Sequence, residues 1–201
     1  MTTLERVRAR ALEAAAEPPA RPWRVDLFLA WSLTIGFSLA VGLVTGVLGA
    51  WSSGPLLVHA SPVLLLLLAQ LTGAYGAIAP AARRAQLASL VIAGAGMAAL
   101  VSSRGAGMES ASPEWLCSLS HLGLVAGPCA ALLLLQRRAH LTVLRTLSAG
   151  VAAGSIGALA GELVCGRGSL HVALFHLPVW IAAAAFTALL GRVLRSATYA
   201  P

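Results

Sequence analysis

Residues 27–50 read LFLAWSLTIGFSLAVGLVTGVLGA, a stretch of 24 residues without one charged side chain. About 20 apolar residues in a helix are enough to cross the roughly 30 Å hydrocarbon core of a bilayer. The stretch therefore predicts a transmembrane helix. We do not expect a cleaved signal peptide, because the run is too long, a long segment precedes it, and it lacks a convincing small-residue cleavage site.

Five further apolar runs follow along the chain. They are residues 56–79, 86–103, 116–135, 143–165 and 172–190. Of the 201 residues, 58% are hydrophobic and 10% are charged, with a mean hydropathy of +0.84. A soluble domain carries about 25% charged residues, so a soluble fold of this size could not bury this much apolar surface. The sequence predicts an all-α polytopic membrane bundle of six transmembrane helices.

The net charge of +7 comes from 14 basic residues, all of them arginines. If the chain crosses six times, twelve arginines fall on one side of the membrane and only Arg104 and Arg167 on the other. The twelve are Arg6, Arg8, Arg10, Arg21, Arg24, Arg83, Arg84, Arg137, Arg138, Arg145, Arg192 and Arg195. Cytoplasmic loops of membrane proteins carry excess arginine, so both termini are predicted to be cytoplasmic. We therefore attribute the positive charge to membrane topology and not to nucleic-acid binding.

The predicted organisation has three parts: a cytoplasmic segment at 1–25, a transmembrane domain at 26–195 and a cytoplasmic tail at 196–201. Within the first part, Thr2 and Glu5 fit a capping box, and Pro18 ends the predicted helix. A short apolar stripe follows helical spacing along it. The stripe consists of Leu4, Val7, Ala11 and Leu12. This amphipathic helix is expected to lie on the membrane surface, to be a partly ordered tail, or to dock into a soluble partner.

The run 143–165 contains glycines at spacings of four, three and four residues, which place them on one face of a helix. They are Gly150, Gly154, Gly157 and Gly161. Small residues let membrane helices approach closely, so this face is predicted to pack against neighbouring helices.

Two of the three cysteines, Cys117 and Cys165, lie at the outer ends of predicted spans, whereas Cys129 lies within a span and is expected to be a small buried hydrophobe. Histidines occur at the same outer depth. They are His59, His121, His171 and His176, and Glu162 precedes Cys165 by three residues.

Three interpretations of these outer residues stay open: a disulfide or redox pair of Cys117 and Cys165, a zinc or copper site, and no shared chemistry. The metal-ligand candidates are Cys117, His121, Cys165, His171 and His176. No other cofactor is expected.

The motifs of common enzyme classes (HExxH, GxSxG, a P-loop, or GxGxxG after a strand) do not occur in the sequence. The protein is therefore not expected to be an enzyme. A small transporter or metal-handling membrane protein, or a structural subunit of a membrane complex, remains an alternative.

The second half of the chain, about residues 113–195, resembles the NrsF family of six-span membrane anti-sigma factors. The resemblance is carried by PEWLC at 113–117, Gly127-Pro128, LQRR at 135–138, the glycine-rich stretch 150–161 ending in Cys165, HLPVW at 176–180 and Gly191-Arg192.

This resemblance implies a protein of the bacterial cytoplasmic (inner) membrane that holds an extracytoplasmic-function sigma factor through its cytoplasmic segment. An outer-side redox or metal signal would release the sigma factor. By this resemblance Cys117 and Cys165 match the sensor cysteine pair of the family. The sigma-binding segment would be the N-terminal helix around Leu4, Val7, Arg8 and Leu12.

Overall fold

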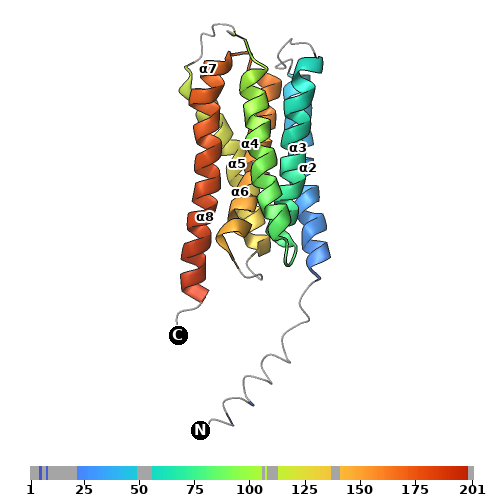
Figure 1. The fold of residues 1–201 in the computed structure, drawn as a ribbon, viewed down its shortest axis with the longest axis vertical. Helices are drawn as coiled ribbons and strands as arrows, with labels where there is room; N and C mark the ends of the chain where they lie inside the picture. Colours follow the sequence, from blue (N-terminus) through green and yellow to red (C-terminus); the bar gives the residue numbers. More distant parts are fainter. Residues whose placement is uncertain are drawn as a thin grey trace.

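The computed structural model describes Glu5, Arg8 and residues 22–48, 56–105, 107, 113–136 and 141–198, with the backbone alone for 56–59 and 194–198. Long helices run up and down through this part of the chain (Figure 1). They are α2 (Trp23–Val47), α3 (Leu56–Ile78), α4 (Arg83–Ser102), α5 (Trp115–Gln136), α6 (Val143–Val164) and a last helix composed of α7 (Ser169–His171), η1 (Val172–His176) and α8 (Leu177–Thr198).

Within the described residues, six helices are long and apolar enough to cross a membrane. The predicted all-α bundle of six transmembrane helices is thus confirmed, and the chain is a multi-pass membrane protein. The first helix begins at Trp23, four residues before the predicted 27. Pro22 directly precedes it, and Asp26 lies in the first turn, where a carboxylate interacts well with the helix dipole.

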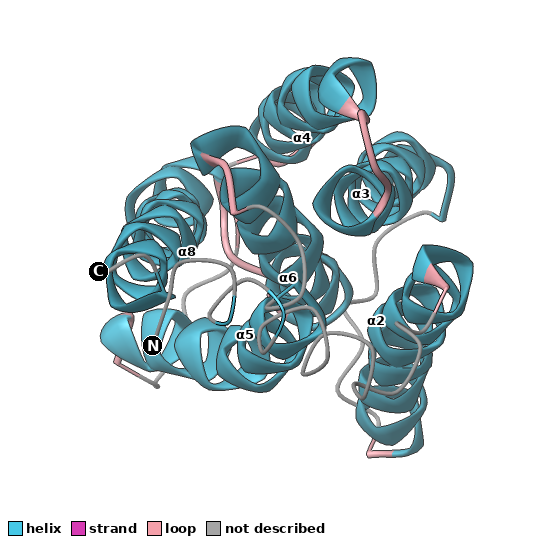
Figure 2. Cartoon of the chain, turned by 90° about the horizontal axis from the view of Figure 1, so that it is seen from below, coloured by secondary structure: helices cyan, strands magenta, loops and turns pink. Residues whose placement is uncertain are grey.

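Helix α6 lies in the centre, surrounded by the other helices (Figure 2). In the most apolar part of α6, 83% of the residues are buried inside the bundle. The corresponding share for α2, at the periphery, is 17%. Small side chains allow the neighbouring helices to pack this closely around α6. A Cβ atom added at Gly73 of α3 would lie 2.8 Å from the Ser148 carbonyl oxygen of α6, and one added at Gly150 would lie 2.6 Å from Ala184 Cα of α8. The three backbones therefore approach as closely as glycine permits.

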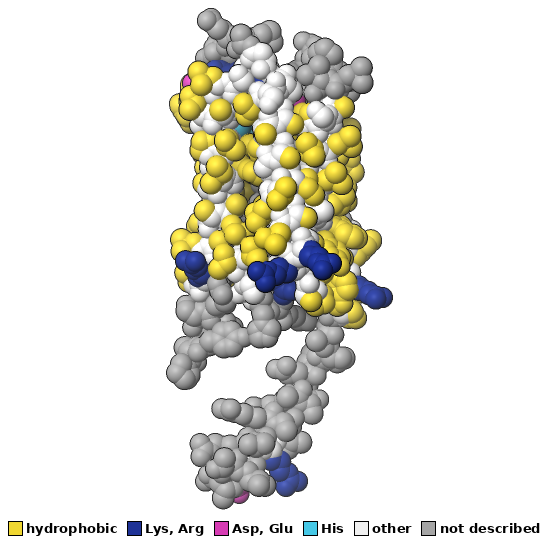
Figure 3. Space-filling view, in the orientation of Figure 1, with side chains coloured by type: hydrophobic (Ala, Val, Ile, Leu, Met, Phe, Trp, Pro, Cys, Tyr) yellow, Lys and Arg dark blue, Asp and Glu magenta, His cyan; other side chains and the backbone are white. Residues whose placement is uncertain are grey.

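The outer surface of the bundle is apolar over most of its height, as expected for side chains that face lipid (Figure 3). Basic side chains gather at one end. The up-and-down order of the helices places Arg24, Arg83, Arg145 and Arg192 at this end, since they lie near the starts of α2, α4 and α6 and toward the end of α8. We call it the basic end, and the opposite end the cysteine end.

Buried polar side chains at the basic end bind the last carbonyl groups of α3. Arg145 donates to the Ala79 oxygen at 2.8 Å, and the Gln136 amide donates to the Ala77 oxygen at 3.1 Å. A membrane offers no water for free carbonyl groups, so these contacts complete the end of α3 and join it to α5 and α6.

Candidate cysteine and histidine site

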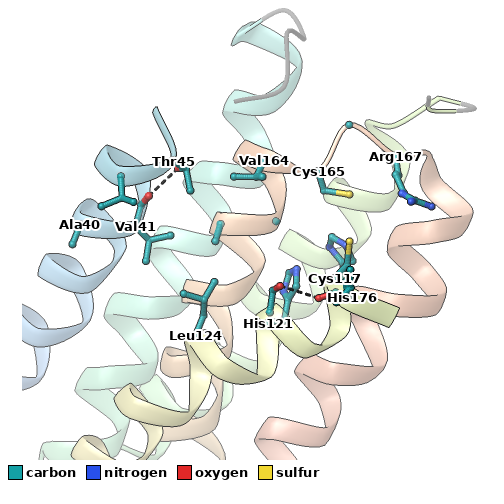
Figure 4. Close-up of a pocket in the computed structure, with 16 residues that line it drawn as sticks. Ala40, Val41, Thr45, Cys117, His121, Leu124, Val164, Cys165, Arg167 and His176 are labelled. Carbon is teal, nitrogen blue, oxygen red and sulfur yellow. Dashed lines mark hydrogen bonds between the residues drawn. The ribbon is translucent and has the colours of Figure 1, made fainter. Parts of the chain in front are cut away.

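Four potential metal ligands converge at the cysteine end. Cys117 lies in the first turn of α5, Cys165 directly follows α6, His171 ends α7, and His176 ends η1. One ligand atom from each residue lies within 4.8 Å of the corresponding atoms of the other three. Figure 4 shows Cys117, His121 and His176 close together, with Cys165 near them. We refer to Cys117, Cys165, His171 and His176 as the Cys₂His₂ cluster.

The two histidines of this cluster are brought together by the π-helical segment η1. In an α-helix, residues five apart point to different faces, whereas π-helical hydrogen bonds join residue i to residue i+5. Here the Leu177 amide donates to the Val172 oxygen, and the rings of His171 and His176 lie 5.2 Å apart, centroid to centroid. Pro178 explains the change of pitch, because proline has no N–H to donate to the carbonyl of Leu174 and its ring crowds that carbonyl.

The imidazoles are buried and have free nitrogen atoms. His171 is 7% exposed and His176 is 2% exposed, and neither ring nitrogen of either residue has a hydrogen-bond partner. The Glu114 carboxylate lies close to His171, with 3.9 Å between His171 Nδ1 and Glu114 Oε1. Buried polar atoms are normally satisfied, so four unpartnered nitrogens in one place need an explanation.

His121 lies one helical turn after Cys117 and packs on His176, with ring centroids 4.2 Å apart. Both rings fit because Gly161 of α6 has no side chain: an added Cβ would lie 2.8 Å from His121 Nε2 and 2.9 Å from His176 Nδ1. The glycine at this position therefore makes room for the histidines.

Arg104, just after α4, fixes the backbone that carries Cys165. Its guanidinium forms an ion pair with Glu162 at 2.7 Å, and both side chains are almost fully buried. The same guanidinium donates to the carbonyl oxygens of Glu162, Cys165 and Arg167. A single arginine thus completes the carboxyl end of α6 and holds the following loop against α4.

A second ion pair lies nearer the surface. Arg167 contacts Glu114 at 3.2 Å, and Glu114 directly precedes α5. The Arg167 residue also forms an antiparallel bridge with Gly107. Because Glu114 is 53% exposed, this pair contributes little to stability and mainly aligns the start of α5 with the loop after α6.

An apolar cavity of about 790 Å³ lies beside the cluster, between α2, α5 and α6 (Figure 4). Cys117, Cys165 and His176 line one part of its wall, and Val41 and Val44 of α2 line another. The two half-buried thiols therefore face this cavity.

The structure brings some of the predicted site residues together and leaves others apart. Cys117, Cys165, His171 and His176 meet in the cluster, and His121 contacts its edge. Cys129 lies in the apolar core near Leu132, away from the cluster. The side chain of His59 is outside the described residues.

The predicted sigma-binding residues Leu4, Val7 and Leu12 are also outside the described residues. Arg8 is described, as helical and exposed. Arg104 was not among the predicted site residues, and the only signal in the sequence was its position on the side of the membrane that carries few arginines.

The four glycines of α6 lie against two different neighbours. A Cβ at Gly154 would collide with the Trp180 indole, and Gly150 also faces α8. A Cβ at Gly157 would lie 3.1 Å from Val125 of α5, and Gly161 faces the rings of His121 and His176.

The fold and the cluster define this chain as a six-helix membrane protein with thiol and imidazole groups gathered at one end. It is similar to the carotenogenesis protein CarR of Myxococcus xanthus, with 35% identity in an alignment 201 positions long that covers 98% of this chain and 90% of CarR. The chain therefore belongs to the CarR family. No protein-family model and no solved structure matches it.

Proposed function

We propose that this protein is a membrane anti-sigma regulator. Its cytoplasmic N-terminal segment holds an extracytoplasmic-function sigma factor at the bacterial inner membrane. A redox or metal signal at Cys117 and Cys165, on the outer side, releases the sigma factor. The protein acts by binding and has no catalytic activity of its own.

One observation carries this proposal: reactive groups and the start of the first span lie at opposite ends of the bundle. The Cys₂His₂ cluster is at the cysteine end, whereas α2 begins with Trp23 at the basic end. The positive-inside rule assigns the basic end to the cytoplasm. A signal received at one face could thus be passed to a protein bound at the other.

The resemblance of residues 113–195 to NrsF-type anti-sigma factors supports the same role. The relationship to a carotenogenesis protein suggests that the regulated process is the formation of carotenoids. We infer that the genes transcribed by the released sigma factor include genes of carotenoid formation.

The partner assignment is tested by co-purification from a detergent extract. The full chain and a variant lacking residues 1–17 are each expressed with a candidate extracytoplasmic-function sigma factor from the same genome. The full chain is expected to retain the sigma factor and the shortened variant to lose it, because the predicted docking helix is absent. In cells, deletion of the whole gene is expected to raise the carotenoid content.

A matched control keeps the segment and changes its apolar stripe, with Leu4→Asp and Leu12→Asp in one variant and Arg6→Gln in another. Loss of retention with the aspartates and little change with Arg6→Gln would support docking through the stripe. Equal retention by the full chain and the shortened variant would show that the N-terminal assignment is wrong.

A further inference from the structure

We propose that Cys117, Cys165, His171 and His176 bind one zinc ion at the cysteine end. This deepens the signal-sensing half of the proposed function: the ion site stands on its own contacts, and its regulatory meaning rests on the anti-sigma role.

The first support is the ligand set. Two thiols and two imidazoles form the Cys₂His₂ combination that binds structural zinc in a tetrahedral arrangement. With bond lengths of about 2.0–2.3 Å, tetrahedral ligand atoms lie roughly 3.3–3.8 Å apart. Here the ligand atoms lie within 4.8 Å of one another, so contraction by about 1 Å forms the site.

The second support is the state of the imidazoles. His171 and His176 are buried, and none of their ring nitrogens has a hydrogen-bond partner. Leaving a buried polar atom unsatisfied is unfavourable, and a metal bond would remove that cost for one nitrogen of each ring. The π-helical segment η1 turns both rings toward the thiols, and π-bulges are frequent at functional sites.

The third support is charge. Zn²⁺ with two thiolates and two neutral imidazoles is electrically neutral, which suits a site at the end of apolar helices. A monovalent copper ion with the same ligands would leave one uncompensated negative charge. The two arginines of this end, Arg104 and Arg167, are already paired with Glu162 and Glu114.

Zinc binding and disulfide formation exclude one another at this site, because both use the same two sulfur atoms. Zinc would hold Cys117 and Cys165 reduced and keep α5 joined to the loop after α6. Removal of the ion frees the thiols, which face the neighbouring cavity.

The test uses the full chain purified in detergent, with the affinity tag removed. Metal analysis is expected to find one zinc per chain. Replacement by Co²⁺ is expected to give thiolate-to-cobalt charge-transfer absorption together with the d–d bands of tetrahedral Co²⁺. Cys117→Ser and His176→Asn are expected to lose most of the zinc, whereas the matched variant Cys129→Ser, which changes a cysteine outside the cluster, keeps it.

Wild-type protein with less than a tenth of an equivalent of zinc and no thiolate band with Co²⁺ would overturn the proposal. Equal zinc content in Cys117→Ser and Cys129→Ser would also overturn it. The Co²⁺ spectrum is recorded on the unmodified chain, so it does not depend on whether a variant folds. Retention of the sigma factor is measured separately on the same preparations, which keeps failure of the anti-sigma role distinguishable from failure of the zinc site.

Discussion

Arg104 places a full charge in the packed region of the bundle, where its partner Glu162 is also inaccessible. Removal of one member of such a pair leaves the other charge buried and uncompensated. The backbone oxygens of Cys165 and Arg167 also depend on this guanidinium. Arg104 therefore stabilises the loop that carries a cluster thiol without itself belonging to the cluster.

Arg104→Gln is expected to destabilise the protein by about 3–5 kcal/mol, because the Glu162 carboxylate would remain buried without its partner. Thermal unfolding in detergent, followed by tryptophan fluorescence, measures the change. The same variant is expected to bind zinc more weakly, since the Cys165 loop loses its support.

Arg167→Gln is the control for this prediction. Its partner Glu114 is half-exposed, and exposed pairs contribute about 0–1 kcal/mol. The double variant Arg104→Gln/Glu162→Gln is expected to recover part of the lost stability, because neither charge remains. If Arg104→Gln and Arg167→Gln were equally stable, the buried pair would not have the role described here.

At the scale of elements, the close contacts of α6 with its neighbouring helices depend on glycines, which have no side chain. Gly73 of α3 faces the backbone of α6, with an added Cβ 2.8 Å from the Ser148 oxygen and 3.0 Å from the Ala152 nitrogen. A backbone cannot move aside as a flexible side chain can. Substitution at this position must therefore separate two helices.

Gly73→Ala is expected to destabilise the protein by about 1–3 kcal/mol through overpacking, measured by the same unfolding assay. Gly94→Ala is the matched control in α4, because nothing lies within 4 Å of an added Cβ there. Alanine is favoured over glycine inside a helix by roughly 0.5–1 kcal/mol, so the control is expected to be neutral or stabilising. A Gly94→Ala variant less stable than Gly73→Ala would contradict the packing of α3 on α6.

The six spans were predictable from the sequence because apolar runs long enough to cross a bilayer are a property of local composition. The placement of Cys117 and Cys165 at the same end of the bundle followed from counting crossings, whereas their proximity is seen only in the structure. The approach of His171 to His176 did not follow, since their spacing of five residues places them on different faces of an α-helix. It depends on the π-helical segment before Pro178.

The contacts of Glu162 also could not be predicted from the sequence. In the sequence Glu162 precedes Cys165 by three residues, a spacing that places two residues on one helical face. In the structure it binds Arg104, which lies 58 residues earlier in the chain. Pairings across such a separation depend on how the helices pack, and periodicity along one helix cannot reveal them.

At the scale of the whole molecule, the proposed orientation predicts which cysteines can be reached from outside the cell. Intact cells with a permeable outer membrane are first treated with a reductant and a chelator, which are then washed out. A membrane-impermeant maleimide is then expected to label Cys117 and Cys165. Both are half-buried and line the cavity, whereas Cys129 is 8% exposed within a span and is expected to stay unlabelled.

Variants that retain one cysteine each assign the labelling to a residue. Labelling of the Cys165 variant only after the inner membrane is opened would reverse the orientation and place the cluster in the cytoplasm. Both the sensing side and the partner-binding side would then have to be exchanged.

The tight enclosure of α6 has a mechanical consequence. A helix of 22 residues is about 33 Å long, and α6 contacts α3, α5 and α8 within the bundle. The loop at Cys165 is at one end of this helix, and Arg145, which donates at 2.8 Å to the oxygen of Ala79 just after α3, is near the other. A shift of α6 along its axis would therefore displace the Cys165 loop at one face of the membrane and the Arg145 contact at the opposite face together.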